Sequence, residues 1–539
     1  MKKIFLSFLI AGGIVNGAAA QGTLSGDLQM NLNSFIRDES IHASDNPLYD
    51  KYMSGGESWL SLRYNYKGFT AFARLDAFHN SNLKTPTQGL SAYGIGAFSL
   101  SKEIQGLTIT GGYIYDQIGS GILFRAYEDR GLLIDNALVG IHLKYKLADN
   151  ITVKAFTGQQ KQLVDGNVTG RYKPIIKGFN AEGDFNAGDK LRLSPGFGVL
   201  NRTLDDNSFG IVKSNVLNQP VGDQFVPRYN MYAFTGYNTL TYGDFSWYVE
   251  GAYKTHEAIK APNEVTQAQD YYFDRSGTVF YSTLGFARKG IAVNLTGKRT
   301  ENFVMRTSPV ETILEGMLNW QPVVARLRPQ RLIARYTPAS QDVSEMAGGA
   351  DVLISPKENL DITLNYTHIN KLDNVKLYRE VYGEVEYRSA EKWIVIGGAQ
   401  YLYYNQGVYQ QKHKDVTAVT PFAEVTYRIT PKKSIRVEAE YQHTEDDFGS
   451  WAYLLLEYNI APHWSFTAAD MYNVEPRDGG VKTGGSGQHY PYLFVAYSKG
   501  PHRVTLAYVK QTEGINCSGG VCRYEPAFSG VRAGITTTF

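Results

Sequence analysis

Four arginines are crowded into the segment NWQPVVARLRPQRLIARYTPASQD: Arg326, Arg328, Arg331 and Arg335. Guanidinium groups form strong, often two-pronged hydrogen bonds with carboxylates. Candidate carboxylates occur later in the chain, where charged and apolar residues alternate, and they are Glu380, Glu384, Glu386, Glu438 and Glu440. Alternation places each set of glutamates on one face of an extended segment. We therefore expect the arginine segment to dock against an acidic wall; the alternative is a solvated charged face.

A second group of charged residues lies in YDQIGSGILFRAYEDRGLLIDNALVG, where Arg125, Glu128, Asp129 and Arg130 stand among apolar residues. The glycines of IGSG permit a tight turn at its start. Because the segment is too apolar for a freely solvated loop, we predict that residues 116–136 fold back into the interior of the protein. The alternative is a capped, helical outer loop with a purely packing role.

The sequence contains no recognisable catalytic or metal-binding pattern. It has no Gly-x-Ser-x-Gly motif, and its ten histidines form neither His-x-x-x-His nor His-Glu-x-x-His. We therefore predict that the protein is not an enzyme and uses no cofactor or metal ion. Cys517 and Cys522 are the only cysteines, and in an exported protein this close spacing predicts one short-loop disulfide rather than a metal site.

The elements that must position these charges are strands. In ALVGIHLKYKL the apolar Val139, Ile141 and Leu143 alternate with His142 and Lys144, which is the period-two pattern of a sheet between an apolar and an aqueous phase. The pattern recurs in 24 segments, each about long enough to cross a bilayer as a tilted strand. The segments are 23–38, 57–66, 69–79, 91–102, 106–115, 137–147, 150–160, 173–184, 190–202, 228–241, 244–255, 277–288, 290–300, 347–355, 359–369, 376–388, 392–403, 416–428, 434–444, 449–459, 463–473, 488–498, 501–511 and 527–539.

Connections between these segments alternate between short turns such as NYKGF and KLADN and longer polar stretches such as 203–227 and 257–276. This rhythm is typical of outer-membrane barrels, and a soluble sandwich or propeller has no such rule. The sequence therefore predicts an all-β fold, a transmembrane antiparallel β-barrel of about 24 strands with long outer loops partly folded into the lumen. If residues 309–336 formed one more hairpin, the barrel would have 26 strands.

Both ends of the chain indicate export and membrane assembly. Lys2, Lys3 and an apolar run predict a signal peptide over residues 1–20, followed by a single barrel domain over residues 21–539. Removing Lys2 and Lys3 from the 54 basic residues leaves 52, which balances the 52 acidic residues, so nucleic-acid binding is not expected. The final strand, GVRAGITTTF, resembles the C-terminal assembly signal of bacterial outer-membrane proteins, which ends on a residue such as Phe539 and is recognised by the insertion machinery.

The motifs GSGILFRAYEDRG, IDNALVG and ARLRPQRLIARYTPASQD, together with the whole mature chain, resemble an uncharacterised, porin-like family of large outer-membrane β-barrels from Bacteroidota. The resemblance implies a location in the outer membrane of a Gram-negative bacterium, contact with its lipids, and both termini in the periplasm. It implies no functional residues.

Two functions are compatible with these features. In the first, the protein is a passive porin-like channel for a small solute, with its lumen constricted by residues 301–346 and lined by opposed cationic and anionic walls. In the second, it is a sealed structural or assembly barrel that acts with an envelope protein partner. Because strand one begins just after the predicted signal peptide, we expect no separate plug domain before the barrel, and an unobstructed barrel of this size would leak. Inward loops or a partner must therefore fill it.

Overall fold

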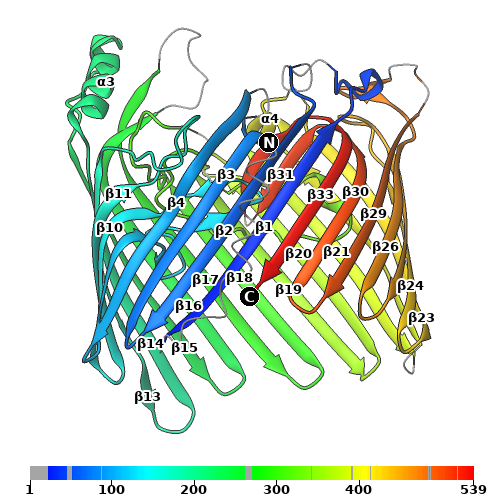
Figure 1. Cartoon of the computed structure of the whole chain (residues 1–539), viewed down its shortest axis with the longest axis horizontal. Coiled ribbons are helices and arrows are strands. Elements are labelled where there is room, and N and C mark those ends of the chain that lie inside the picture. Colours follow the sequence, from blue (N-terminus) through cyan, green and yellow to red (C-terminus); the bar gives the residue numbers. More distant parts are fainter. Residues whose placement is uncertain are drawn as a thin grey trace.

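The computed structural model describes residues 22–44, 51–85, 88–260, 270–312, 314–340, 343–389, 392–412, 414–482, 485, 487–518 and 520–539. The predicted signal peptide, residues 1–20, lies outside the described residues. The described chain folds as a closed antiparallel barrel of 24 strands (Figure 1). The barrel sheet has 25 segments in all, because the short β13 continues β12 and both pair with β14.

The barrel strands follow one another in chain order around the wall. They are β1 (Thr23–Phe35), β2 (Ser54–Tyr66), β3 (Phe69–Thr85), β4 (Gln88–Ile104), β5 (Leu107–Ile114), β10 (Leu138–Ala148), β11 (Ile151–Gln160), β12 (Ile175–Gly183) with β13 (Phe185–Ala187), β14 (Leu191–Thr203), β15 (Asn230–Tyr242), β16 (Phe245–Lys260), β17 (Tyr272–Arg288), β18 (Ile291–Glu301), β19 (Glu345–Lys357), β20 (Leu360–Lys371), β21 (Lys376–Ser389), β22 (Trp393–Tyr404), β23 (Val416–Thr430), β24 (Lys433–Gln442), β25 (Trp451–Ile460), β26 (Trp464–Asn473), β29 (Gln488–Lys499), β30 (His502–Gln511) and β33 (Phe528–Thr538).

Each of the 24 predicted segments corresponds to one of these strands, so the predicted fold class is confirmed. The alternative of 26 strands is wrong: among the described residues between 302 and 344 there is no strand of the barrel, only an isolated bridge and the short helix η3 (Ile333–Arg335). The barrel closes where β1 pairs with β33. There the amide of Gly26 donates to the carbonyl of Phe539 (2.9 Å) and the amide of Phe539 donates to Gly26 (3.0 Å).

The outer face of the barrel is apolar and exposed. On β10, Ile141 is 53% exposed and Leu147 is 59% exposed, whereas His142 between them faces inward and contacts Asp116. Aromatic rings pair near the short-turn end of the wall, with 4.3 Å between the ring centroids of Trp393 and Tyr427. Exposed apolar surface on this scale marks a membrane or protein interface, and aromatic girdles border the apolar band of transmembrane barrels.

The two ends of the barrel differ. One end, called here the turn end, carries short turns in which residues with positive φ reverse the chain, for example Lys67 (φ 45°) and Gly68 (φ 75°) between β2 and β3. Glycine suits such positions because it has no side chain to clash. The opposite loop end carries the long connections and helices α3 (Asp206–Leu217) and α4 (Gln406–Gln410) (Figure 1).

Smaller elements lie in the connections. They are the 3₁₀ turns η1 (Glu39–Ile41) and η2 (Val221–Asp223), and four pairs formed by β6 (Gln117–Ile118) with β7 (Phe124–Arg125), β8 (Glu128–Asp129) with β9 (Ile134–Asp135), β27 (Arg477–Asp478) with β28 (Val481–Lys482), and β31 (Gly514–Ser518) with β32 (Val521–Glu525). Among the described residues, no helix combines the length and the apolar character needed to cross a membrane.

Candidate functional site

Two long connections fold into the loop-end half of the lumen and join each other. The first inner loop is residues 115–137, and the second inner loop is the described part of residues 302–344; together they are called the plug. Four hydrogen bonds of 2.9–3.1 Å join the loops: Arg125 N to Leu318 O, Trp320 N to Gly121 O, Asn319 Nδ2 to Ile122 O, and Asn136 Nδ2 to Met317 O. The first inner loop contains four short strands and no helix, so the predicted inward fold is observed and the helical alternative is wrong.

The plug is bound to one side of the wall by an apolar core. Ile118, Leu123 and Leu318 are fully buried against inward-facing wall residues. These wall residues are Leu138, Phe156, Ile176, Leu200, Met231, Ala233, Ala252 and Val279. Full burial of a large apolar side chain stabilises a fold by about 1.5–3 kcal/mol. The inward face of the wall therefore includes a buried apolar patch at the loop end, where alternation alone suggested a face in water.

The second inner loop also packs against the opposite part of the wall. Val324, Ala325 and Tyr336 contact a cluster of inward residues on β19 to β23. Leu332 is fully buried against Trp451 and Met471 on β25 and β26. The plug thus contacts strands that are far apart around the barrel.

A buried ion cluster anchors the first inner loop. Arg74 of β3 is only 2% exposed, and its guanidinium contacts Asp76 (2.6 Å), Glu128 (2.8 Å) and Asp135 (2.6 Å). Lys161 is a second cation on Asp135, at 2.6 Å. Burial acts to raise the pKa of Asp135, but Lys161 and Arg74 together hold that pKa below its usual value. The carboxylate is therefore charged at neutral pH and holds the loop to the wall.

The other predicted charges of this loop have separate partners. The Arg125 guanidinium lies between the rings of Tyr127 (4.4 Å) and Trp320 (4.9 Å), which belong to the first and second inner loops. Arg130 pairs with Glu128 at 3.1 Å. Asp129 accepts a hydrogen bond from the backbone amide of Leu132 at 3.0 Å and stabilises the local turn.

Arg328 and Arg326 of the arginine segment contact different residues of the wall. Arg328 lies 3.9 Å from Glu380 and stacks on the ring of Tyr382 at 3.7 Å. Arg326 pairs with Asp351 at 2.8 Å rather than with any of the predicted glutamates. The guanidinium of Arg328 is buried, and its Nε and Nη2 have no hydrogen-bond partner among the described residues.

Glu440 binds the backbone of the arginine segment rather than its side chains. One carboxylate oxygen accepts from the amide of Arg331 (2.7 Å) and the other from the amide of Leu332 (3.0 Å). Burial lowers the pKa of the Arg331 guanidinium, with a further contribution from neighbouring Arg335. Arg335 stacks on the Trp451 ring at 4.2 Å. A carboxylate that accepts two amides of one short turn fixes the position of that turn.

Three predicted wall glutamates do not contact the arginine segment. Glu384 accepts from the hydroxyl of Tyr382 at 2.5 Å, Glu386 pairs with Arg388 at 2.7 Å, and Glu438 pairs with Arg436 at 2.8 Å. The expected opposition of four arginines to a glutamate wall is therefore wrong for these residues. The physical reason is that these carboxylates have partners on the wall itself, a tyrosine hydroxyl for Glu384 and an arginine for Glu386 and for Glu438.

Sequence reasoning missed several buried wall cations that hold the plug. Besides Arg74 and Lys161, Lys298 pairs with Glu345 at 2.6 Å and donates to the carbonyl of Pro322 in the second inner loop at 2.7 Å. Arg202 donates to the carbonyl of Arg306 at 3.3 Å. The sequence does show these cations at inward strand positions near the loop end, which could have marked them as anchors. No pattern in the sequence, however, identifies the loop residue that each one contacts.

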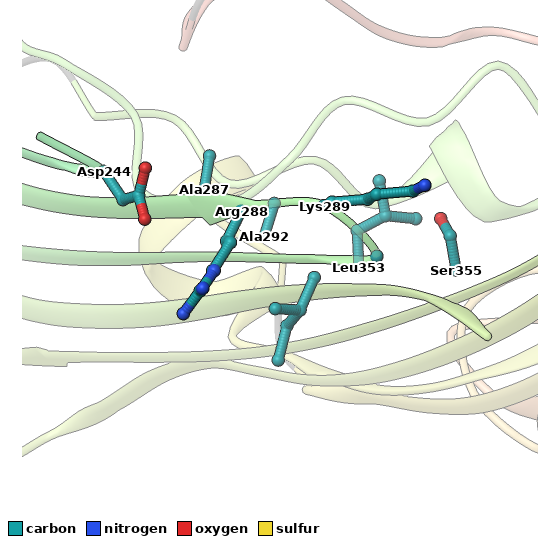
Figure 2. A pocket seen from close by; sticks show the side chains of 9 residues that line it. Asp244, Ala287, Arg288, Lys289, Ala292, Leu353 and Ser355 are labelled. Carbon is teal, nitrogen blue, oxygen red and sulfur yellow. The ribbon is translucent and has the colours of Figure 1, made fainter.

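Other candidate sites are separate from the plug. Cys517 and Cys522 form a disulfide across the β31–β32 hairpin. In the described part of the chain, no group of histidine, cysteine and carboxylate side chains is arranged to hold a metal ion. A shallow pocket at the turn end, lined by Asp244, Arg288 and Lys289, lies at the β15–β16 and β17–β18 turns. Figure 2 shows that Arg288 and Lys289 extend in different directions, so they do not converge on one ligand.

A closed barrel of 24 strands whose own loops enter its lumen is a large outer-membrane-type barrel. The whole chain, residues 1–539, matches the model of a family of unknown function (DUF6029), and the protein belongs to that family. No protein with a curated description matches the sequence.

Solved structures resemble the chain at low sequence identity. The open form of the ferric-catecholate import receptor Fiu from E. coli K12 has 10% identity and a TM-score of 0.40 over 97% of this chain and 82% of that chain. The ferric enterobactin receptor PfeA from Pseudomonas aeruginosa, in complex with BCV-L6, has 7% identity and a TM-score of 0.43 over 97% and 82% of the two chains. The translocation pore of the P pilus usher PapC has 9% identity and a TM-score of 0.43 over 96% and 99%.

Proposed function

We propose that the protein is an outer-membrane channel for a small solute, closed at rest by the plug. The observation that carries this proposal is the buried contact between the two inner loops and inward wall residues on distant strands. The exposed apolar outer face supports a place in a bilayer, with lipid as its surroundings. In this arrangement the turn end and both chain termini are periplasmic, Phe539 is part of the signal read by the insertion machinery, and the source is a Gram-negative bacterium of the Bacteroidota.

The turn-end half of the lumen supports a role in passage. There the wall carries ion-paired residues such as Arg436, which contacts Glu424 (3.0 Å), Glu438 (2.8 Å) and Glu457 (3.3 Å). A charged lining of this kind suits a water-filled vestibule and tunes selectivity. The plug is held at the loop end by apolar contacts and buried ion pairs, so passage requires its displacement. Solute then moves passively down its gradient.

The test is single-channel conductance of the purified barrel in a planar bilayer. Replacing residues 321–337 with a short Gly/Ser linker removes the part of the plug that contacts β19 to β26, and we expect conductance to rise severalfold or more. The matched control replaces the equally long outer segment 206–222, which contains α3, and leaves conductance unchanged. An unchanged conductance in the 321–337 variant, with the barrel correctly folded, refutes the channel.

A sealed barrel that acts in an envelope assembly is a second candidate. It is favoured by the outer loop between β14 and β15, which exposes Leu217 (58%), Val221 (86%) and Val226 (84%), and from which α3 projects at the loop end (Figure 1). Large exposed apolar side chains mark interaction surfaces when they cluster. Cross-linking in intact cells from positions in this loop tests the assembly role. A specific envelope partner together with zero conductance in the plug variant supports it.

A further inference from the structure

A recess of about 570 Å³ lies between the first inner loop and the inner face of β2 to β5. Its lining includes Arg63, Phe72, Tyr113, Arg125 and Tyr127. Arg63 pairs with Phe72 across β2 and β3, a few residues from the turn that joins these strands. The recess therefore lies on the turn-end side of the plug, where a solute in the vestibule reaches it.

The cations of this recess fall into two groups. Arg74 and Arg130 are engaged with carboxylates of the ion cluster. By contrast, Arg125 and Arg63 have no ion-pair partner within the part of the chain that the structure describes. Their guanidinium groups lie against aromatic rings, Arg125 on Tyr127 and Trp320 and Arg63 on Phe72 at 5.7 Å. Stacking orients a guanidinium plane and leaves its N–H groups available to an acceptor at the edge.

The carboxylates that line the recess are already engaged. Glu128 contacts Arg74 and Arg130. Asp116 contacts His142 at 2.9 Å and Lys154 at 3.1 Å. The carboxylates of the recess are paired with cations, whereas two of its arginines have no carboxylate partner among the described residues. The recess therefore favours an anion over a cation.

Two tyrosines add neutral polar groups. Tyr113 is 3% exposed, and its hydroxyl has no hydrogen-bond partner among the described residues. Burial raises the pKa of Tyr127 to about 12, and its hydroxyl therefore stays neutral and does not repel an anion.

We propose that this recess binds a small organic anion. Its carboxylate or phosphate oxygens accept hydrogen bonds from Arg125 and Arg63, and its carbon skeleton lies against Phe72 and the tyrosine rings. The inference rests on the proposed channel function, because it names the class of solute that the channel passes. The volume of the recess exceeds that of an inorganic ion and suits a molecule the size of a sugar phosphate or an aromatic acid.

Binding is measured on the full-length barrel in detergent by isothermal titration calorimetry, with glucose 6-phosphate and benzoate as probes and glucose as the neutral control. We expect saturable binding of at least one anion and none of glucose. Arg125→Gln and Arg63→Gln weaken that binding tenfold or more, whereas Arg125→Lys retains part of it. Arg192→Gln is the matched control, because Arg192 is an exposed arginine whose partner is Asp184 on the facing strand of the same hairpin.

The probe that binds more tightly identifies the recognised group, which is the phosphate for glucose 6-phosphate and the carboxylate for benzoate. Absence of binding to wild type, equal binding in the arginine variants, or equal binding of glucose overturns the proposal. Thermal unfolding of each variant shows that the barrel is intact, and a glutamine variant that fails this check is replaced by the lysine variant at the same position. Since the measurement in detergent needs no flux, binding without conductance refutes only the channel, and conductance without binding refutes only the recess.

Discussion

Glu440 offers a direct way to loosen the plug without altering the loop itself. Its carboxylate accepts the backbone amides of Arg331 and Leu332 and is 4% exposed. In Glu440→Ala, two amides of the second inner loop lose their acceptor. Each unsatisfied buried donor costs about 1–3 kcal/mol, and water that enters reduces this cost. We take a total of about 2–4 kcal/mol, which shifts the equilibrium between closed and displaced plug roughly 30- to 700-fold.

The assay is single-channel recording of wild type and variant at neutral pH. We expect the wild-type barrel to be closed for nearly all of the recording and Glu440→Ala to open far more often, with an unchanged conductance for each opening. The open probability rises because the closed state is destabilised, and the amplitude stays the same because the wall of the lumen is intact.

Glu424→Ala is the matched control. Glu424 lies on the neighbouring strand β23 and also faces the lumen, but its partner is Arg436 of the wall rather than the plug. The reasoning is refuted if both variants open equally often, or if Glu440→Ala stays as closed as wild type.

Two further predictions concern the anchor of the first inner loop. Arg74→Met removes the cation shared by Asp76, Glu128 and Asp135, and breaking a buried ion cluster from one side costs about 3–5 kcal/mol. We expect a lower unfolding midpoint in urea for this variant, whereas Arg192→Met, in an exposed pair, leaves the midpoint nearly unchanged. The second prediction is a pH dependence. Because the pKa of Asp135 is lowered in the folded protein, its stabilising contribution is complete above its ordinary value of about 3.9 and is lost as the pH falls through the lower folded value. The difference in free energy of unfolding between wild type and Asp135→Asn should therefore stay constant from pH 8 to pH 5 and shrink only in stronger acid, and a decrease already at pH 6 would contradict this assignment.

The strands of the barrel wall were predictable because the apolar and polar surroundings of each strand determine which residue types alternate along it. Ile141 and Leu143 face outward and His142 faces inward, and this period-two pattern depends only on adjacent residues. The first inner loop was also predictable as an inward segment, since its apolar residues have no place in a solvated loop. Both inferences use the contrast between apolar and polar side chains along a short stretch of chain.

The partners within the plug were not predictable, because they depend on contacts between distant residues. Arg74 and Glu128 are 54 residues apart, and Leu332 and Glu440 are 108 apart. A charge pattern shows that an arginine needs an acceptor but does not show which acceptor the fold supplies. Glu440 illustrates the difference, because it was expected to pair with guanidinium groups and instead binds two backbone amides, which no side-chain pattern reveals.

The two halves of the plug differ in how firmly they are held. The first inner loop combines an apolar core with the ion cluster around Arg74, whose buried charges have several partners each. The arginine segment has weaker ionic contacts. Arg326, which pairs with Asp351, is half exposed. Arg328 lies 3.9 Å from Glu380, and two of its buried nitrogen atoms lack hydrogen bonds among the described residues. Buried charges with incomplete hydrogen bonding contribute less stability than fully satisfied ones. Displacement of the arginine segment therefore costs less than displacement of the first inner loop. This order keeps the anion recess in place while the lumen opens beside it.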